Sequence, residues 1–238
     1  MPTPVQTPTS ADAVALVIGA GGGIGSALVR ALEASGRYDR VIGLGRQSDP
    51  PLDLLDETSV ARALDTAAKA GVIRLVVHAA GVLQDTGMVP EKSLSALDPA
   101  AMARAFAINA TGPALVLKHM APRLPRQGRC VFAALSARVG SIGDNRLGGW
   151  YAYRASKAAL NQLVRTAAIE LARRNPEMVC VALHPGTVAT RLSAPFRTEG
   201  PGVQTPETAA AKLLAVLESL PREASGGFFD AEGQTVPW

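Results

Sequence analysis

Tyr153 and Lys157 are the two residues of this chain whose types and spacing are best suited to chemistry. Four residues apart on a helix, they share one face and can contact the same small molecule. Tyrosine is a weak acid with a reference pKa of about 10. A lysine cation beside it favours the phenolate and lowers that pKa, so the pair predicts a proton donor that works near neutral pH. Tyr151 is a rival donor, but Ala155 rather than a lysine lies four residues after it.

A glycine cluster near the N-terminus provides a second signal. It follows an apolar run at 14–18, which is typical of a buried parallel strand, and it precedes a segment of helical composition at 26–34. A strand, a glycine turn and a helix N-terminus together bind a pyrophosphate, because backbone N–H groups and the helix dipole face the anion. The spacing fits Gly-x-x-x-Gly-x-Gly, since the third position of Gly-x-Gly-x-x-Gly would be Ile24. The candidate cofactor-binding residues of this loop are Gly19, Gly21, Gly22, Gly23, Ile24 and Gly25.

Apolar, strand-like runs alternate with helical segments along the chain. Strands are expected near 14–18, 40–45, 73–78, 129–135, 178–183 and 226–230, with a weaker one near 51–54. Helices are expected near 24–35, 57–70, 99–123, 150–174 and 206–219. This alternation predicts an α/β fold of the Rossmann type, a doubly wound parallel sheet of about seven strands with helices on both faces. The carboxyl ends of the strands then share one edge of the sheet, where ligands bind.

The length of 238 residues suits one domain, which we expect to cover 13–238. Residues 1–12 are rich in proline and threonine and predict a disordered tail rather than a signal peptide. The Gly- and Pro-rich stretch at 193–205 predicts a mobile loop over the substrate site, although an ordinary loop explains it equally well.

The composition excludes several classes of partner. The formal charge of +4 comes from dispersed arginines and lysines without interleaved aromatics, so no nucleic acid partner is expected. No apolar run is expected to reach the roughly 18 residues of a membrane span, so no membrane partner is expected. Cys130 and Cys180 lie in apolar runs and predict reduced, buried thiols in a cytoplasmic protein. No spacing of cysteines and histidines predicts a metal site.

Five motifs together, in their order and spacing, resemble the short-chain dehydrogenase/reductase family along nearly the whole chain. They are the glycine loop at 19–25, the segment His78-Ala79-Ala80-Gly81, Asn109, the pair Tyr153 and Lys157, and Pro185-Gly186. The segments 148–154 and 226–230 resemble the branch that contains the sniffer-like carbonyl reductases and the C-factor proteins. The resemblance implies further cofactor-binding residues, which are Asp53, Ala79, Ala80, Gly81, Asn109, Tyr153, Lys157, Pro185, Gly186 and Val188.

Asn109 can also be judged from its local sequence. Pro113, four residues later, has no N–H, so the carbonyl of Asn109 loses its normal helical partner, and Gly112 weakens the helix further. The resemblance implies that this carbonyl holds a water in a proton relay to Lys157. A simple proline kink would explain the break but not the asparagine.

The residues after the second expected strand bear on the choice of cofactor. In NAD-binding folds an acidic residue there holds the ribose 2′-hydroxyl. This chain has Arg46 instead, and a guanidinium matches a 2′-phosphate in charge and geometry. We therefore expect NADP (NADPH) in preference to NAD.

The catalytic serine that the resemblance implies has two candidates in this chain. The family has a serine after the fifth strand that binds the substrate carbonyl, but alignment to a common Ser-Ser pair places Ala137 at the second, usually catalytic position. Ser136 remains and is our candidate, and Ser141 is the alternative. His78 replaces the family's first asparagine, and it is expected either beside the adenine or as a plain structural histidine.

The resulting hypothesis is an NADP(H)-dependent oxidoreductase that moves hydride between nicotinamide and a small-molecule carbonyl or alcohol. The catalytic residues would be Asn109, Ser136, Tyr153 and Lys157. The alternative is an NADP(H)-binding signalling or scaffold protein without significant catalysis, which the resemblance to the C-factor proteins and the missing serine at Ala137 motivate. The resemblance implies a homodimer through the helices near 99–123 and 150–174, although packing on the sheet explains their apolar faces equally well. Residues after Gly186, among them Leu192, Pro195 and Phe196, predict an apolar pocket.

Overall fold

The computed structural model describes residues 12–194 and 202–238. The expected tail therefore lies outside the described residues except for Asp12. The expected loop at 193–205 is described only at its two ends, and Pro195 and Phe196 lie outside.

Six strands of the described chain form one parallel sheet in the order β2-β1-β3-β4-β5-β8. Their bounds are β1 (Ala13–Ile18), β2 (Arg40–Leu44), β3 (Val72–His78), β4 (Cys130–Leu135), β5 (Met178–His184) and β8 (Phe228–Asp230). Because β1 lies between β2 and β3, the strand order reverses beside it, and such switch points bind ligands in open α/β sheets. The expected doubly wound fold is confirmed, with six strands rather than about seven in this sheet.

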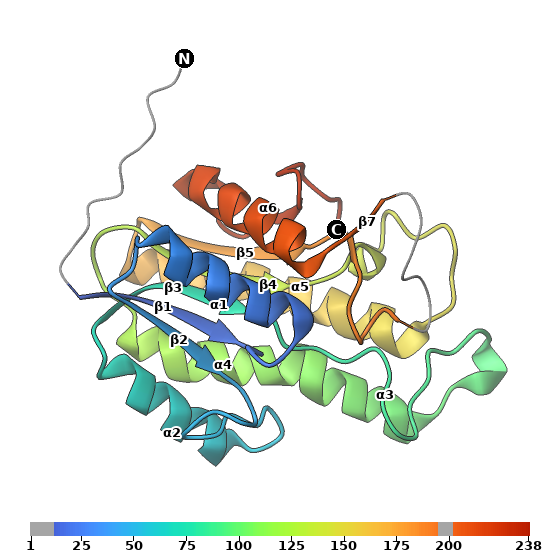
Figure 1. Cartoon of the computed structure of the whole chain (residues 1–238). Helices are drawn as coiled ribbons and strands as arrows, with labels where there is room; N and C mark the ends of the chain where they lie inside the picture. The colour runs from blue at the N-terminus through green and yellow to red at the C-terminus, as the bar shows by residue number, and fades with distance from the viewer. Residues whose placement is uncertain (1–11, 195–201) are drawn as a thin grey trace.

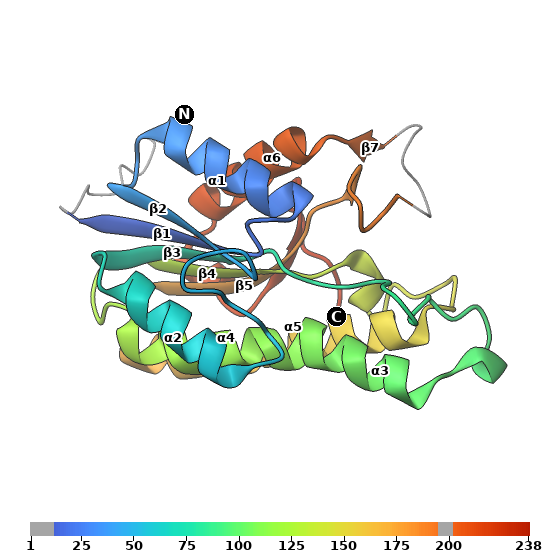
Figure 2. The ribbon, with the colours of Figure 1, turned by 60° about the horizontal axis from the view of Figure 1, so that its bottom comes forward.

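Helices cover both faces of the sheet, as Figures 1 and 2 show. One layer contains α1 (Gly23–Ser35) and α6 (Pro206–Ser219), and the other contains α2 (Glu57–Ala68), α4 (Gly112–Met120) and α5 (Tyr151–Arg174). The helix α3 (Pro99–Phe106) leads into α4 through a π-helical turn at Ala107–Thr111. Short 3₁₀ turns lie at Leu94–Ala96, Ala121–Arg123, Arg138–Gly140 and Arg222–Ala224.

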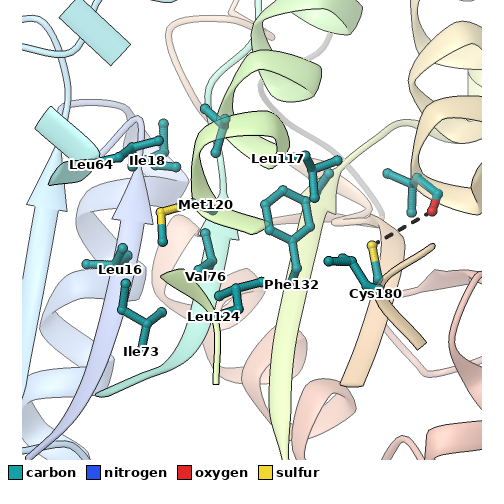
Figure 3. Close-up of a cluster of buried hydrophobic side chains, with 14 of the residues drawn as sticks. Leu16, Ile18, Leu64, Ile73, Val76, Leu117, Met120, Leu124, Phe132 and Cys180 are labelled. Atoms are coloured by element: carbon teal, nitrogen blue, oxygen red, sulfur yellow. Dashed lines mark hydrogen bonds between the residues drawn. The ribbon is translucent and has the colours of Figure 1, made fainter. Parts of the chain in front are cut away.

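The core has two layers because both faces of each central strand are buried. Leu16 and Ile18 pack with α2 and α4, whereas Ala15 and Val17 on the opposite face pack with α1 and α6. Strands of this kind read as continuous apolar runs rather than alternating ones. Figure 3 shows the first layer, where Phe132 of β4 lies near Met120 and Leu117 of α4.

Local signals in the sequence set three helix ends. The side chain of Asp98 accepts hydrogen bonds from the first turn of α3, and that of Thr205 accepts one from Thr208 at the start of α6. Gly36 ends α1 in the left-handed conformation, with φ 62°. Each helix end lies where capping chemistry predicts it.

Two expected elements are wrong in detail. The segment 51–54 forms no strand, because Pro50 and Pro51 lack the N–H groups that a ladder needs. Leu52 and Leu54 are nevertheless buried in the core. The helix expected at 99–123 is divided by the π-helical turn. In addition, the short strands β6 (Thr187–Val188) and β7 (Val203–Gln204), which were not expected, pair with each other outside the main sheet.

One described stretch, Pro99–Arg123, is long and apolar enough for a membrane span by length and composition. The prediction that no apolar run reaches this length is therefore wrong. In the fold this stretch contributes Val116, Leu117 and Met120 to the core between the sheet and its helices, and core helices of soluble proteins meet the same criteria.

Candidate active site

In the glycine loop between β1 and α1, backbone contacts leave no room for a side chain at Gly19 or Gly25. A Cβ atom on Gly25 would lie 2.1 Å from the carbonyl oxygen of Gly19. Gly19 has φ +87°, and its Cβ would lie 2.6 Å from the backbone nitrogen of Ala80. Gly21 and Gly22 are exposed, and the N-cap residue Gly22 makes no side-chain capping bond to α1. This uncapped, exposed helix N-terminus fits the pyrophosphate of a dinucleotide.

Two other segments meet this loop at the carboxyl edge of the sheet. The segment after β3 lies beside Gly19, where the N–H of Ala79 donates to Ile18 at 2.7 Å. The segment after β5 lies beside Gly23, whose Cβ would lie 2.9 Å from Cγ2 of Thr190. Thr190 therefore lines the predicted phosphate site, and our reading of the sequence missed it. Its hydroxyl, four residues after Gly186, was the available signal.

The residues expected around the adenosine lie beyond β2. Arg46 is exposed and makes no hydrogen bond or ion pair within the described residues. Asp53 is half-buried, and its carboxylate accepts a hydrogen bond from the N–H of Leu55 at 3.0 Å. Its expected role in cofactor binding stays a prediction, because the hydrogen bond of its carboxylate to Leu55 belongs to a local turn.

Lys157, Gly81 and Asn109 come together in the buried part of the site. Lys157 is 3% exposed, and its Nζ donates to the carbonyl oxygen of Leu135 at 2.8 Å. A Cβ atom on Gly81 would lie 3.2 Å from Oδ1 of Asn109 and 3.3 Å from Nζ of Lys157. The three segments meet so closely that only glycine fits at position 81 without displacing a neighbour.

Asn109 lies in the π-helical turn and is fully buried. Its side chain accepts from the N–H of Val82 and donates to the carbonyl of the same residue, both at 2.8 Å. It also donates to the hydroxyl of Ser156 at 3.0 Å. The helix break expected from Pro113 is confirmed, and the π turn is closed by a bond from Gly112 to Ala107.

Tyr153 is half-buried at the start of α5, and the Nζ of Lys157 lies 5.8 Å from the centre of its ring. Burial raises the pKa of the Tyr153 phenol, which is opposite to the expected direction. Burial also lowers the pKa of Lys157 from 10.5 to about 8, so this side chain is largely protonated at pH 7. The two side chains are thus adjacent as expected, but desolvation outweighs the attraction of the cation for the phenolate.

The expected serines have partners away from Tyr153. Ser136 is 4% exposed, and its hydroxyl donates to Oδ1 of Asn161 at 2.6 Å. Asn161 follows Tyr153 by eight residues on α5, roughly 12 Å along the helix axis. The hydroxyl of Ser141 accepts a bond from the N–H of Asp144 at 3.1 Å. The role expected for Ser136 stays a prediction, and Asn161 is a partner that spacing alone did not reveal.

His78 is fully buried at the end of β3, and neither ring nitrogen has a partner within the described residues. Burial, with a smaller contribution from Lys157, lowers the pKa of its imidazole from 6.5 to about 3. It alternates with Val77 and therefore faces the helix layer of α4 and α5. Its expected position beside the adenine stays a prediction.

No group of three histidine, cysteine, aspartate or glutamate side chains that could hold a metal ion occurs in the described parts of the chain. Cys130 and Cys180 are free and buried in the core, as expected.

Curated relatives cover most of the chain. The C-signal of Myxococcus xanthus is 39% identical over 177 residues, which are 74% of this chain and 99% of that protein. The 1-hydroxy-2-glutathionyl-2-methyl-3-butene dehydrogenase of Rhodococcus sp. (strain AD45) is 33% identical over 235 residues, covering 94% of this chain and 98% of that protein.

Solved structures share the fold. An NADPH-bound carbonyl reductase from chicken fatty liver superposes with a TM-score of 0.83 and 24% identity, covering 95% of this chain and 94% of that one. The carbonyl reductase Sniffer of D. melanogaster gives 0.81 and 20%, covering 95% and 99%. An NADP-bound short-chain dehydrogenase/reductase from Burkholderia multivorans gives 0.77 and 26%, covering 95% and 99%.

A family model described as enoyl-(acyl carrier protein) reductase matches residues 28–212, which is more than half of the chain. The glycine loop at 19–25, called the glycine cradle below, lies just before this match, and Tyr153 and Lys157 lie within it. The chain therefore belongs to the short-chain dehydrogenase/reductase family and is an oxidoreductase acting on a CH–OH or C=O group.

Proposed function

We propose that this protein is an NADP(H)-dependent oxidoreductase in which Tyr153 exchanges a proton with a carbonyl or alcohol substrate. The observation that supports the proposal is that Lys157, Asn109 and Gly81 lie close together beside Tyr153, at the same edge of the sheet as the glycine cradle. Nicotinamide, when bound, supplies or accepts the hydride. The protein's own residues hold the reactants and provide the proton.

Tyr153 donates the proton, and Lys157 favours its release. Burial alone makes the Tyr153 phenol a poor acid, because it raises the pKa. A protonated Lys157 close to the ring opposes that rise, since it stabilises the negative charge that develops as the proton leaves. Lys157 has a lowered pKa of about 8, so we expect carbonyl reduction to decline as the pH rises above that value.

Asn109 and Leu135 hold the lysine side of the site in place. The Asn109 side chain joins the segment after β3 to Ser156, the residue before Lys157. The carbonyl of Leu135, at the end of β4, accepts from the Lys157 ammonium. The ammonium therefore has a fixed position before any substrate arrives, which lowers the entropic cost of reaching the reactive geometry.

The preference for NADP rests on Arg46. It is exposed beyond the end of β2, where an NAD-specific site would carry an acid. An unpaired guanidinium there can bind the two charges of a 2′-phosphate in a bidentate manner. The bound NADP in the Burkholderia multivorans relative supports this choice.

The test is NADPH consumption with a panel of aldehydes, ketones and quinones, with NADH in parallel. Turnover that is faster with NADPH supports the proposal, and Arg46→Ala should remove the preference. Tyr153→Phe should lower kcat by about 10³-fold and leave NADPH affinity unchanged. Full activity of Tyr153→Phe would exclude the assigned acid, and NADPH binding without turnover across the panel would favour a non-catalytic protein.

A further inference from the structure

The catalytic helix α5 begins without a capping acceptor from its own flanking residues. Its N-cap residue, Trp150, has the left-handed conformation with φ 51° and ψ 45°, and an indole offers no acceptor. Gly148 and Gly149 before it also have positive φ, at 63° and 65°. The first N–H groups of α5 are therefore open to acceptors from a distant part of the chain or to water.

Glu91, from the segment between β3 and α3, provides these acceptors. Its main-chain oxygen accepts from the N–H of Trp150 at 2.5 Å, and its carboxylate oxygens accept from the N–H of Ala152 at 3.2 and 3.4 Å. Glu91 is 5% exposed. A buried carboxylate at a helix N-terminus lies at the positive end of the helix dipole, where negative charge is favoured.

The same segment also contacts the buried part of the active site. Val82 is held by Asn109 through the two hydrogen bonds of 2.8 Å. Met88 packs with Ala152 of α5 and Ala105 of α3 in a small buried cluster. In Figure 2 this segment and the start of α5 lie at the same end of the molecule. The segment 82–91 thus links Asn109 to the first turn of the catalytic helix.

We propose that Glu91 is a positioning residue for Tyr153, the residue that directly follows Ala152. This inference rests on the proposed function, in which Tyr153 is the proton donor. Lys157 and Asn109 are fixed by the carbonyl of Leu135 and by Val82, so the loss of Glu91 would move Tyr153 relative to both. A misplacement of about 1 Å in a reacting group can lower a rate by about 100-fold.

The test compares Glu91→Ala with Glu91→Gln and with a matched control, Asp56→Ala. Glutamine keeps an oxygen acceptor for Ala152 but removes the charge. Asp56 is also a helix-capping carboxylate, because it accepts from Thr58 and Ser59 at the start of α2, but α2 carries no proposed catalytic residue. The control therefore separates the loss of a cap from the loss of the position of Tyr153.

We expect Glu91→Ala to lower kcat by about tenfold or more while the Kd for NADPH changes by less than about twofold. Glu91→Gln should recover most of kcat, and Asp56→Ala should lower the melting temperature without changing kcat. If Glu91→Ala folds poorly, Glu91→Asp, whose carboxylate is one methylene shorter, should show a smaller fall in kcat. An unchanged kcat in a destabilised Glu91→Ala or Glu91→Asp variant would overturn the proposal.

Amide hydrogen exchange provides a measurement that does not depend on turnover. Glu91→Ala should accelerate exchange at 150–156, and Asp56→Ala should not. Unchanged exchange at 150–156 would overturn the positioning role even if the protein reduces a carbonyl. Failure of the wild-type protein to turn over any carbonyl would instead contradict the proposed function, so the two failures are distinguishable.

Discussion

The glycine cradle at 19–25 and the lysine cluster of Asn109, Lys157 and Ser136 lie at the same edge of the sheet, but different kinds of contact build them. In the cradle, backbone meets backbone, as the 2.1 Å approach from a Cβ on Gly25 to the oxygen of Gly19 shows. In the cluster, side chains of Asn109, Lys157 and Ser136 bind main-chain or side-chain groups of other segments. The cradle therefore depends on the absence of side chains, and the cluster depends on particular ones.

This difference decides what each region tolerates. An added methyl group at Gly19 or Gly25 has nowhere to go, because its neighbours are backbone atoms. A removed side chain in the cluster leaves a buried polar partner without its hydrogen bond, which costs about 1–3 kcal/mol. A buried charge is the exception, because its removal also removes a desolvation penalty.

Lys157→Met is the substitution with the largest expected effect on activity. We expect kcat to fall by about 10³-fold, because the cation that favours the Tyr153 phenolate is lost. The free energy of unfolding at pH 7 should nevertheless rise by about 1–2 kcal/mol, since burial lowers the Lys157 pKa to about 8 and the charge therefore destabilises the fold. Steady-state kinetics and chemical denaturation measure the two effects.

The pH dependence of stability gives the control for Lys157→Met. A lysine whose pKa is lower in the folded state makes the wild-type protein more stable as the pH rises from about 8 to 10.5. The variant should lack this gain. A variant that loses stability at pH 7 would show that the bond to Leu135 outweighs the desolvation of the charge.

Gly25→Ala tests the cradle. The Cβ would lie 2.1 Å from a backbone oxygen, so the loop must move, and we expect the NADPH affinity to fall by about 100-fold. Isothermal titration calorimetry measures the affinity. Gly36→Ala at the other end of α1 is the control, because its φ of 62° strains alanine without touching the cradle. Equal affinities in the two variants would contradict a backbone-built phosphate site.

The difference between a site built by backbone and a site built by side chains also explains which features could be predicted from the sequence. The strands, the glycine cradle and the helix break before Pro113 follow from local rules of burial, backbone freedom and missing N–H groups, and each was predicted. The partners of the cluster come from residues far apart in the chain, so the bonds from Ser136 to Asn161 and from Ala152 to Glu91 were not.

The errors have equally specific causes. The strand near 51–54 was wrong because its apolar leucines indicate burial but not a ladder, and the two prolines exclude the ladder. The direction of the Tyr153 pKa was wrong because the spacing to Lys157 shows charge proximity, while desolvation depends on all the surrounding segments.

His78→Leu tests how the buried imidazole at the end of β3 affects the pH dependence of stability. Burial lowers the His78 pKa from its ordinary value of 6.5 to about 3. The contribution of the neutral ring to stability is therefore fully present above pH 6.5 and is lost as the pH falls from 6.5 towards 3. We expect His78 to account for about 2 kcal/mol of the stability lost between pH 7 and pH 5. Urea denaturation at both values measures it, and an unchanged loss in the variant would assign the acid sensitivity to other groups such as His184, whose pKa is also lowered.

Ser136→Ala and Ala137→Ser together give the smallest and most selective test. Removal of a group that stabilises the reacting carbonyl costs about 10²–10³-fold in kcat. We expect Ser136→Ala to lose less than about tenfold, together with about 1–3 kcal/mol of stability, because its hydroxyl is used by buried Asn161. Ala137 has extended backbone angles and points to the face opposite Ser136, so Ala137→Ser restores the family's second serine and should raise kcat/KM by about tenfold. A loss of 100-fold or more in Ser136→Ala would instead show that Ser136 leaves Asn161 to bind the substrate carbonyl.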